Sequence, residues 1–210
     1  ADCYGPSWGR HKARTRPAVG NHAFLTPGAA PCFQYFGSAT GTPGQGWYSY
    51  DVGAWHVVVL NSNCSKNGGC GPEVPQSLWL AADLAAHPTD CTLAYWHHPR
   101  WPSAVYGNDA NLQTYWDTLD AAGADLILNA HAHMYERFAP MDASGTPDAA
   151  GMRQIVVGTG GGSVAGVVTV HPQSEVRNSN TFGVIKLTLS VDSFDWEFIP
   201  IAGDTFTDTG

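Results

Sequence analysis

Apolar and polar positions define two adjacent strands in the first half of the chain. Residues 47–51 and 55–61 predict strands joined by a turn at residues 52–54, and the second contains the continuous apolar run Val-Val-Val-Leu of a buried strand. Residues 1–46 are instead rich in Gly, Pro, Thr and Ala, and they predict connected loops around one short strand that ends at Val19. The pattern therefore places the start of the core near residue 47.

Helical and strand patterns then alternate. Pro75 suits the first turn of a helix that runs to about Ala86, and residues 91–96 predict a short buried strand. A second helix is expected over residues 110–122, with Asp109 as its N-cap and Gly123 at its C-terminal turn. The remaining strand-like runs are residues 124–129, 154–157, 181–189 and 194–200. Strand-helix alternation followed by strands alone predicts an α/β sandwich built on a mixed sheet.

Composition limits the size and the partners of the protein. The chain has 210 residues, 43% of them hydrophobic and 13% charged, which predicts one domain with a substantial core. Its formal net charge of -8 disfavours nucleic acid and anionic membranes as partners, so a phosphate substrate has to be attracted by a metal or a small cationic site. No apolar run approaches the roughly 20 residues of a spanning helix.

The cysteines suggest an oxidising compartment. Among the five, Cys64 and Cys70 lie close enough in sequence for a disulfide, and none forms a Cys-x-x-Cys pair. A disulfide suits a secreted or periplasmic protein. The pairing of Cys3, Cys32 and Cys91 stays open at this point.

Three polar clusters follow predicted strands and carry candidate chemistry. They are Gly20-Asn21-His22, His97-His98-Pro99 and His131-Ala132-His133. Open α/β sheets bind ligands at the carboxyl ends of their strands, and imidazole is a common ligand of borderline metals. The clusters together predict a metal site, although a single histidine at a strand end is more often an ordinary hydrogen-bonded residue. His56 stands inside a buried strand run, and His11, His87 and His171 have no such partner motif. All four are left outside the site.

These clusters carry a family resemblance. Gly20-Asn21-His22, Ala94-Tyr95-Trp96-His97 and Ala130-His131-Ala132-His133, the last followed by Tyr135-Glu136-Arg137, resemble the third to fifth metal-site motifs of purple acid phosphatases and related calcineurin-like metallophosphoesterases. The resemblance covers most of the chain from about Trp8. It implies an αββα-type mixed-sheet sandwich and metal-dependent hydrolysis of phosphoric esters, with a small-molecule phosphate ester as substrate.

The resemblance also implies roles for individual residues. Asn21, His97 and His131 would ligate one ion, and His133 would ligate the other, with Fe, Zn or Mn as candidate metals. His22 would contact the phosphate and help to protonate the leaving group. Apart from the resemblance, His98 precedes Pro99 and lies beside a presumed ligand. We therefore expect it to line the substrate pocket or to hold a hydrogen bond behind a ligand, which we rank above direct ligation.

Departures from the family pattern leave other functions open. The first two motifs of the family, which supply carboxylate ligands, are absent before Gly20, and Ala23 and Ala130 replace the usual acidic residue and glycine. Residues 1–210 are therefore expected to form one N-terminally incomplete domain, and the loss of its first strand-helix-strand portion stays open. The alternatives to a binuclear phosphoesterase are an inactive remnant that binds one metal or a partner, and a mononuclear zinc hydrolase.

Two further patterns carry less chemistry. Residues 158–163 are rich in glycine but lack the lysine and the following helix of a phosphate-binding loop, so they predict a turn. The chain contains no Gly-x-Ser-x-Gly segment, which removes the best sequence sign of a serine hydrolase. The oligomeric state is left undetermined.

Overall fold

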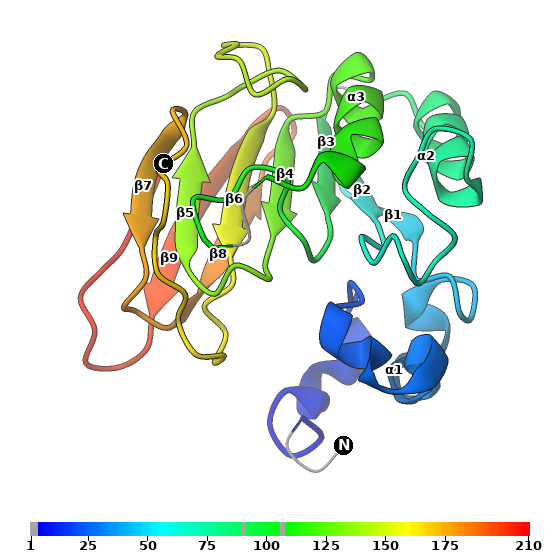
Figure 1. Cartoon of the computed structure of the whole chain (residues 1–210), viewed down its shortest axis with the longest axis horizontal. Coiled ribbons are helices and arrows are strands. Elements are labelled where there is room, and N and C mark those ends of the chain that lie inside the picture. Colours follow the sequence, from blue (N-terminus) through cyan, green and yellow to red (C-terminus); the bar gives the residue numbers. More distant parts are fainter. Residues whose placement is uncertain (1–3, 90, 106–107) are drawn as a thin grey trace.

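A seven-stranded mixed sheet forms the centre of the fold (Figure 1). The computed structural model describes residues 4–89, 91–105 and 108–210. Strands β2, β3, β4 and β6 run parallel, and β1, β5 and β7 pair antiparallel with their neighbours. In spatial order the strands are β1 (Tyr48–Val52), β2 (Trp55–Val59), β3 (Cys91–Tyr95), β4 (Leu126–Asn129), β6 (Arg153–Val157), β5 (Tyr135–Phe138) and β7 (Ser174–Asn178).

Two helices cover one face of this sheet. Helix α2 (Pro75–Ala86) and helix α3 (Gln113–Ala121), which continues from the 3-10 turn η5 (Ala110–Leu112), pack Leu80 and Trp116 against the sheet residues Val58 and Ile127. Leu80 and Trp116 are fully buried. The parallel strands are buried on both faces, as their continuous apolar sequences require.

A hairpin covers the other face. Strands β8 (Gly183–Leu189) and β9 (Phe194–Pro200) form a two-stranded sheet behind β5 and β6 in Figure 1. The rings of Phe198 and Tyr135 lie 4.8 Å apart between the two sheets, and the indole of Trp55 donates a 2.7 Å hydrogen bond to the Ser190 carbonyl. The α/β class and the mixed-sheet sandwich predicted from the sequence are therefore confirmed.

The N-terminal segment lies beyond the carboxyl ends of the parallel strands (Figure 1). It consists of short helical turns: η1 (Trp8–Arg14), η2 (Asn21–Leu25), η3 (Pro27–Ala29), α1 (Ala30–Phe36) and η4 (Gly37–Thr40). The prediction of loops around a strand ending at Val19 is wrong, because residues 15–20 are irregular and this segment forms helical turns. Side chains rather than strand pairing hold it: Asn63 Nδ2 donates to the Val19 carbonyl, and the hydroxyl of Tyr48 donates to the Pro17 carbonyl.

The other predicted elements agree with the structure to within a few residues, whereas β5 and β7 were missed. Both strands carry charged side chains that break the apolar alternation. Glu136 of β5 is nonetheless fully buried, and it accepts hydrogen bonds from the backbone amide of Ser103 and from the hydroxyl groups of Ser103 and Ser174. Only tertiary contacts make a buried carboxylate acceptable in a strand.

The predicted Cys64–Cys70 disulfide is present, with a Cα–Cα distance of 5.1 Å. Cys32 and Cys91 are thiols, and Cys3 lies outside the described residues. The bridge closes the loop after β2, and the hydroxyl of Tyr115 lies 3.0 Å from Cys70 Sγ. The contact of Tyr115 with Cys70 joins this loop to helix α3.

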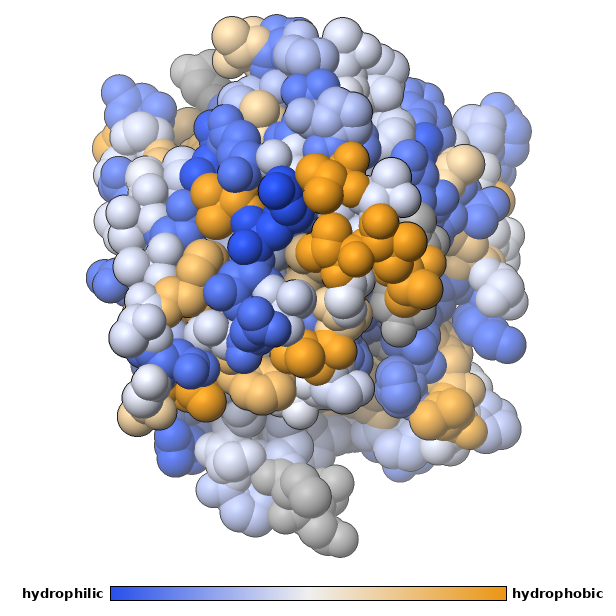
Figure 2. Space-filling model, turned by 60° about the vertical axis from the view of Figure 1, so that its left-hand side comes forward, coloured by the Kyte–Doolittle hydropathy of each residue, from blue (hydrophilic) through white to orange (hydrophobic). Residues whose placement is uncertain are grey.

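The surface mixes polar and apolar residues. Figure 2 shows hydrophobic side chains gathered beside hydrophilic ones on one face of the molecule. Exposed apolar residues come from several loops and from the hairpin, among them Leu25, Val105, Val168 and Val191. In the described part of the chain, no helix has the length and apolar character needed to cross a membrane.

Attachment of the hairpin is testable at Phe198. Removing this fully buried ring by Phe198→Ala is expected to lower the free energy of unfolding by about 3–5 kcal/mol, because it leaves a cavity between the two sheets. The adjacent Ile199→Ala is the control, because that side chain is 40% exposed. Urea denaturation measures both, and equal losses would contradict the packing described.

Candidate functional site

The candidate site lies where β3 and β4 end at the carboxyl edge of the parallel sheet. His97 follows β3, His131 follows β4, and Asn21 enters from the N-terminal turn η2. Parallel strands end at one edge of a sheet, so these segments meet although they are distant in sequence.

His97 is the centre of this cluster. Its Nε2 lies 2.8 Å from Asn21 Oδ1 and 3.1 Å from His131 Nδ1. The rings of His97 and His131 are 5.0 Å apart and meet edge to face. Potential ligand atoms from two other segments therefore both lie close to His97 Nε2.

Two backbone features make this approach possible. A Cβ on Gly20 would lie 3.0 Å from Cε1 and Nδ1 of His97, so glycine leaves room for the ring. His131 has a φ of 53°, a left-handed conformation that is uncommon for residues with a side chain. The Ala130 amide donates to the His97 carbonyl at 3.0 Å, which ties the loop after β4 to the loop after β3.

His98 belongs to the same cluster. Ligand atoms of His97, His98 and His131 all lie within 4.8 Å of one another, and the rings of His98 and His131 are 4.3 Å apart. Its Nδ1 is 2.8 Å from the hydroxyl of Ser62, whose oxygen also accepts a hydrogen bond from the His98 amide. Ser62 thus orients His98 through both its ring and its backbone.

His133 lies beside the cluster but is held by another partner. Its Nδ1 donates to the Ser163 carbonyl at 2.6 Å, and a Cβ on Gly162 would lie 2.5 Å from its ring. The glycine-rich segment predicted as a turn therefore packs directly on this histidine. Among the residues described, no group of three His, Cys, Asp or Glu with ligand atoms within 4.8 Å includes His133.

His22 follows Asn21 in η2 and is exposed to solvent. Its charge would contribute, together with that of His133, to lowering the pKa of both His97 and His131. The structure therefore brings all the sequence-predicted site residues to one edge of the sheet, with Asn21, His97, His98 and His131 in the tightest group.

Burial and mutual repulsion keep the central imidazoles neutral. Burial, with the nearby His98 and His131, lowers the pKa of His97 from 6.5 to about 3. Burial, followed by the charge of His98, lowers the pKa of His131 to about 4. Burial also lowers the pKa of His98. Neutral imidazole is the form that binds metals, so the cluster is ready to ligate near neutral pH.

The three central ligand atoms suit a metal ion. Bonds of 2.0–2.2 Å to one ion at tetrahedral angles place ligand atoms about 3.3–3.6 Å apart. The observed separations of 2.8 and 3.1 Å need only a small expansion to reach that range. Two imidazoles and an amide oxygen fit borderline ions such as Zn, Fe or Mn.

A buried polar network supports the site and was missed from the sequence. The carboxyl end of β2 leads into Asn61, Ser62 and Asn63, all buried. Asn61 accepts from the side chain of Asn63, while Gln76 of α2 bonds both the amide and the carbonyl of Asn61. Three polar residues directly after a buried strand were the available signal, because ligand sites lie at such ends.

No family model matches the chain. It is 31% identical to purple acid phosphatase 21 of Arabidopsis thaliana over 121 residues, which are 55% of this chain and 26% of the relative. It is 25% identical to purple acid phosphatase 15 of the same plant over 150 residues, or 62% of this chain and 27% of the relative. The chain thus spans about a quarter of these relatives.

The fold has a solved counterpart. The purple acid phosphatase PPD1 from yellow lupin (Lupinus luteus) seeds superimposes with a TM-score of 0.77 at 19% identity, covering 93% of this chain and 38% of that structure. The arrangement of strands and helices is therefore that of a purple acid phosphatase over nearly the whole chain.

Gly20 tests the spacing around His97. We expect Gly20→Ala to weaken Zn²⁺ binding at this site, because the added methyl group presses on the ring. Gly166→Ala is the control, since a Cβ there meets nothing within 4 Å. Isothermal titration of the metal-free proteins measures both affinities. An unchanged affinity in Gly20→Ala would show that the close approach of residue 20 to the His97 ring does not matter for binding.

The lowered pKa values predict a pH-dependent stability. The unfolded chain takes up protons on these histidines near pH 6.5, whereas folded His97 and His131 do so only near pH 3 to 4. Stability of the metal-free protein should therefore fall as the pH drops from about 6.5 toward 4. Urea denaturation across this range should show a shallower dependence in His97→Gln than in the parent. Identical pH profiles of the two proteins would show that the lowered pKa of His97 does not cause the pH dependence.

Proposed function

Because this chain is related in sequence to purple acid phosphatases and has their fold, we propose that it hydrolyses phosphoric esters at a metal centre built on Asn21, His97 and His131. The observation that carries the proposal is the convergence of these ligand atoms around His97 Nε2. It agrees with the family resemblance of the three motifs in which the residues stand.

Different side chains would have different roles around that centre. A bound ion would lower the pKa of a water molecule and neutralise phosphate oxygens. Asn21, His97 and His131 hold the ligand positions, while His98, supported by Ser62, lines the site beside them. His22 is exposed next to Asn21, where it would contact the phosphate and donate a proton to the leaving group.

A second ion would be held through His133. This binuclear form of the proposal needs carboxylate ligands in addition, and the described residues do not group one with His133 at ligand distance. A mononuclear zinc hydrolase therefore remains a competing function, supported by the neutral His97–His131 pair. That the domain is N-terminally incomplete stays a prediction.

The loop beside His133 bears on the substrate. The Ala165 amide donates to the His133 carbonyl at 2.9 Å, and the neighbouring Val164 and Val168 are 43% and 66% exposed. This apolar rim favours an ester whose organic group packs beside the phosphate. The net charge of -8 disfavours nucleic acid, so a small-molecule ester is the substrate we propose.

The setting of the protein is part of the proposal. The Cys64–Cys70 disulfide supports an oxidising compartment, either secreted or periplasmic.

Metal content and turnover test the function together. The parent and the His97→Ala/His131→Ala double variant are loaded with Zn²⁺, Mn²⁺ or Fe²⁺, and metal per chain and hydrolysis of 4-nitrophenyl phosphate are measured. If the parent hydrolyses the ester and binds two more metal ions per chain than the double variant, the binuclear enzyme is supported. If it hydrolyses the ester and binds one more ion, the mononuclear enzyme is supported. Absence of turnover in every loaded form supports the non-catalytic alternative.

A single ligand replacement refines this result. His131→Ala is expected to lower turnover by more than the roughly 10–100-fold typical of residues behind a metal ligand, because it removes a ligand itself. His171→Ala is the matched control, because its ring packs on Trp101 and Phe138 rather than on the cluster. Equal rates in the parent and His131→Ala would exclude this residue from the site.

A further inference from the structure

A second cluster of potential ligands lies at the opposite end of the same sheet. His56 stands at the beginning of β2, whereas Asp83 and His87 stand at the C-terminal end of α2. We propose that His56, Asp83 and His87 form a separate binding site for a borderline divalent cation such as Zn²⁺, oriented by Asp51. This inference does not depend on the proposed hydrolysis.

Distances within the cluster are close to those of a metal site. Ligand atoms of His56, Asp83 and His87 all lie within 4.8 Å of one another. His56 Nε2 is 2.9 Å from Asp83 Oδ2, and His87 Nδ1 is 3.5 Å from Asp83 Oδ1. Tetrahedral zinc sites separate ligand atoms by about 3.3–3.6 Å, so no pair in the cluster has to contract by more than about 1.5 Å.

Secondary structure positions the three side chains. Asp83 and His87 are four residues apart at the end of α2, which puts them on one face of the helix. His56 alternates with Val58, which packs into the core shared with α2, so its ring faces that helix. The rings of His56 and His87 stack at 4.5 Å with an interplanar angle of 11°.

Asp51 supplies the orientation that metal-bound histidines require. Its Oδ1 is 2.8 Å from His56 Nδ1, while Nε2 of the same ring faces Asp83. A carboxylate behind one ring nitrogen directs the other nitrogen toward an ion. Binding at Nε2 requires that nitrogen to be without a proton, so any proton on it would be released to solvent.

The carboxylate of Asp83 is buried and has hydrogen-bond partners on both oxygens. Its side chain is only 8% exposed, and Ser49 donates a 2.8 Å hydrogen bond to Oδ1. His56 is 2% exposed, whereas His87 is 47% exposed. His56 and Asp83 are therefore preorganised within the protein. His87 Nδ1 lies 2.8 Å from the backbone carbonyl of Asp83, so the ring has to give up that contact to ligate an ion through Nδ1.

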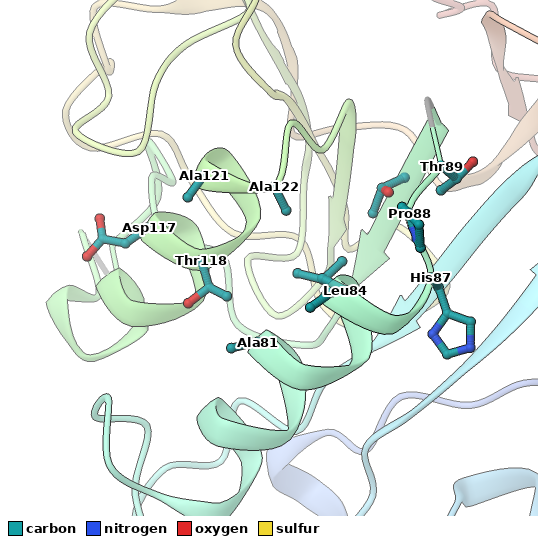
Figure 3. A pocket seen from close by; sticks show the side chains of 11 residues that line it. Ala81, Leu84, His87, Pro88, Thr89, Asp117, Thr118, Ala121 and Ala122 are labelled. Atoms are coloured by element: carbon teal, nitrogen blue, oxygen red, sulfur yellow. The ribbon is translucent and has the colours of Figure 1, made fainter.

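Solvent reaches the cluster from a cavity of about 350 Å³ lined by His56, His87 and Asp51. A larger groove of about 940 Å³ lies between α2 and α3, on the other side of His87. Figure 3 shows the ring of His87 turned away from Ala121, at the end of α3, and from the following Ala122, which both line this groove. The ring of His87 instead stacks on the ring of His56 in β2. Both residues line the smaller cavity, from which we expect a cation to enter.

The chemistry favours a cation over an anion. Two carboxylates and two imidazoles meet there, in a protein whose net charge is -8. Two imidazoles with one carboxylate are a ligand set of zinc sites that keep an open water position. The rival interpretation is a hydrogen-bonded network that only fastens α2 to β1 and β2, and it predicts no metal uptake.

Zinc binding by the whole chain distinguishes these interpretations. The protein is stripped with EDTA and dialysed, and then Zn²⁺ alone is titrated by calorimetry and counted per chain. His87→Ala is expected to lose one equivalent of Zn²⁺, and Asp51→Asn is expected to weaken that binding about 10–100-fold. Both side chains are largely exposed, so these variants should fold, which circular dichroism without metal verifies.

Matched variants separate this site from the histidines at the other end of the sheet. His97→Ala/His131→Ala is expected to retain the equivalent that His87→Ala loses, and His171→Ala is expected to bind as the parent does. Hydrolysis of 4-nitrophenyl phosphate should persist in His87→Ala. Failure of the proposed hydrolysis and failure of the proposed zinc site are therefore distinguished by separate measurements. Unchanged stoichiometry and affinity in both His87→Ala and Asp51→Asn would overturn the proposal.

Discussion

The contact of His97 with Asn21 and His131 is the interaction on which the functional architecture depends, because it joins three segments that are far apart in sequence. Such contact between imidazoles is compatible with folding only when the rings are neutral, since protonated rings at this distance would repel each other. Burial enforces the neutral state by lowering the pKa of His97 and His131. The burial that lowers these two pKa values therefore also keeps the rings in the neutral form that binds a metal.

Room for the cluster comes from backbone as much as from side chains. Gly20 and Gly162 leave space for His97 and His133, and a Cβ on Gly158 would lie 2.1 Å from the Ala132 carbonyl oxygen. The buried residues Asn61 and Asn63 then hold the N-terminal segment at the sheet edge. A loop that lacks strand pairing is thus placed accurately by a few hydrogen bonds, because its buried polar groups have to find partners.

The two ends of the parallel sheet differ in chemistry. The carboxyl end gathers histidines and an amide, whereas the amino end holds His56 between the carboxylates of Asp51 and Asp83. From the sequence, His56 looked like a histidine inside a buried strand, and His87 had no partner motif. The structure adds a contact that no local sequence pattern records, because the ring of His87 at the end of α2 stacks on the ring of His56 in β2.

What the sequence determined by itself is the local part of the structure. Apolar runs such as residues 57–60, Pro75 at a helix start and Asp109 before a helix predicted most elements, because these signals act within a few residues. The motifs around Asn21, His97 and His131 also indicated the candidate metal ligands. Only the tertiary structure decided that residues 15–20 are irregular instead of a strand, that Glu136 is buried in β5, and that Ser62 orients His98. Those outcomes depend on desolvation and on partners distant in the chain, which exist only once the sheet has formed.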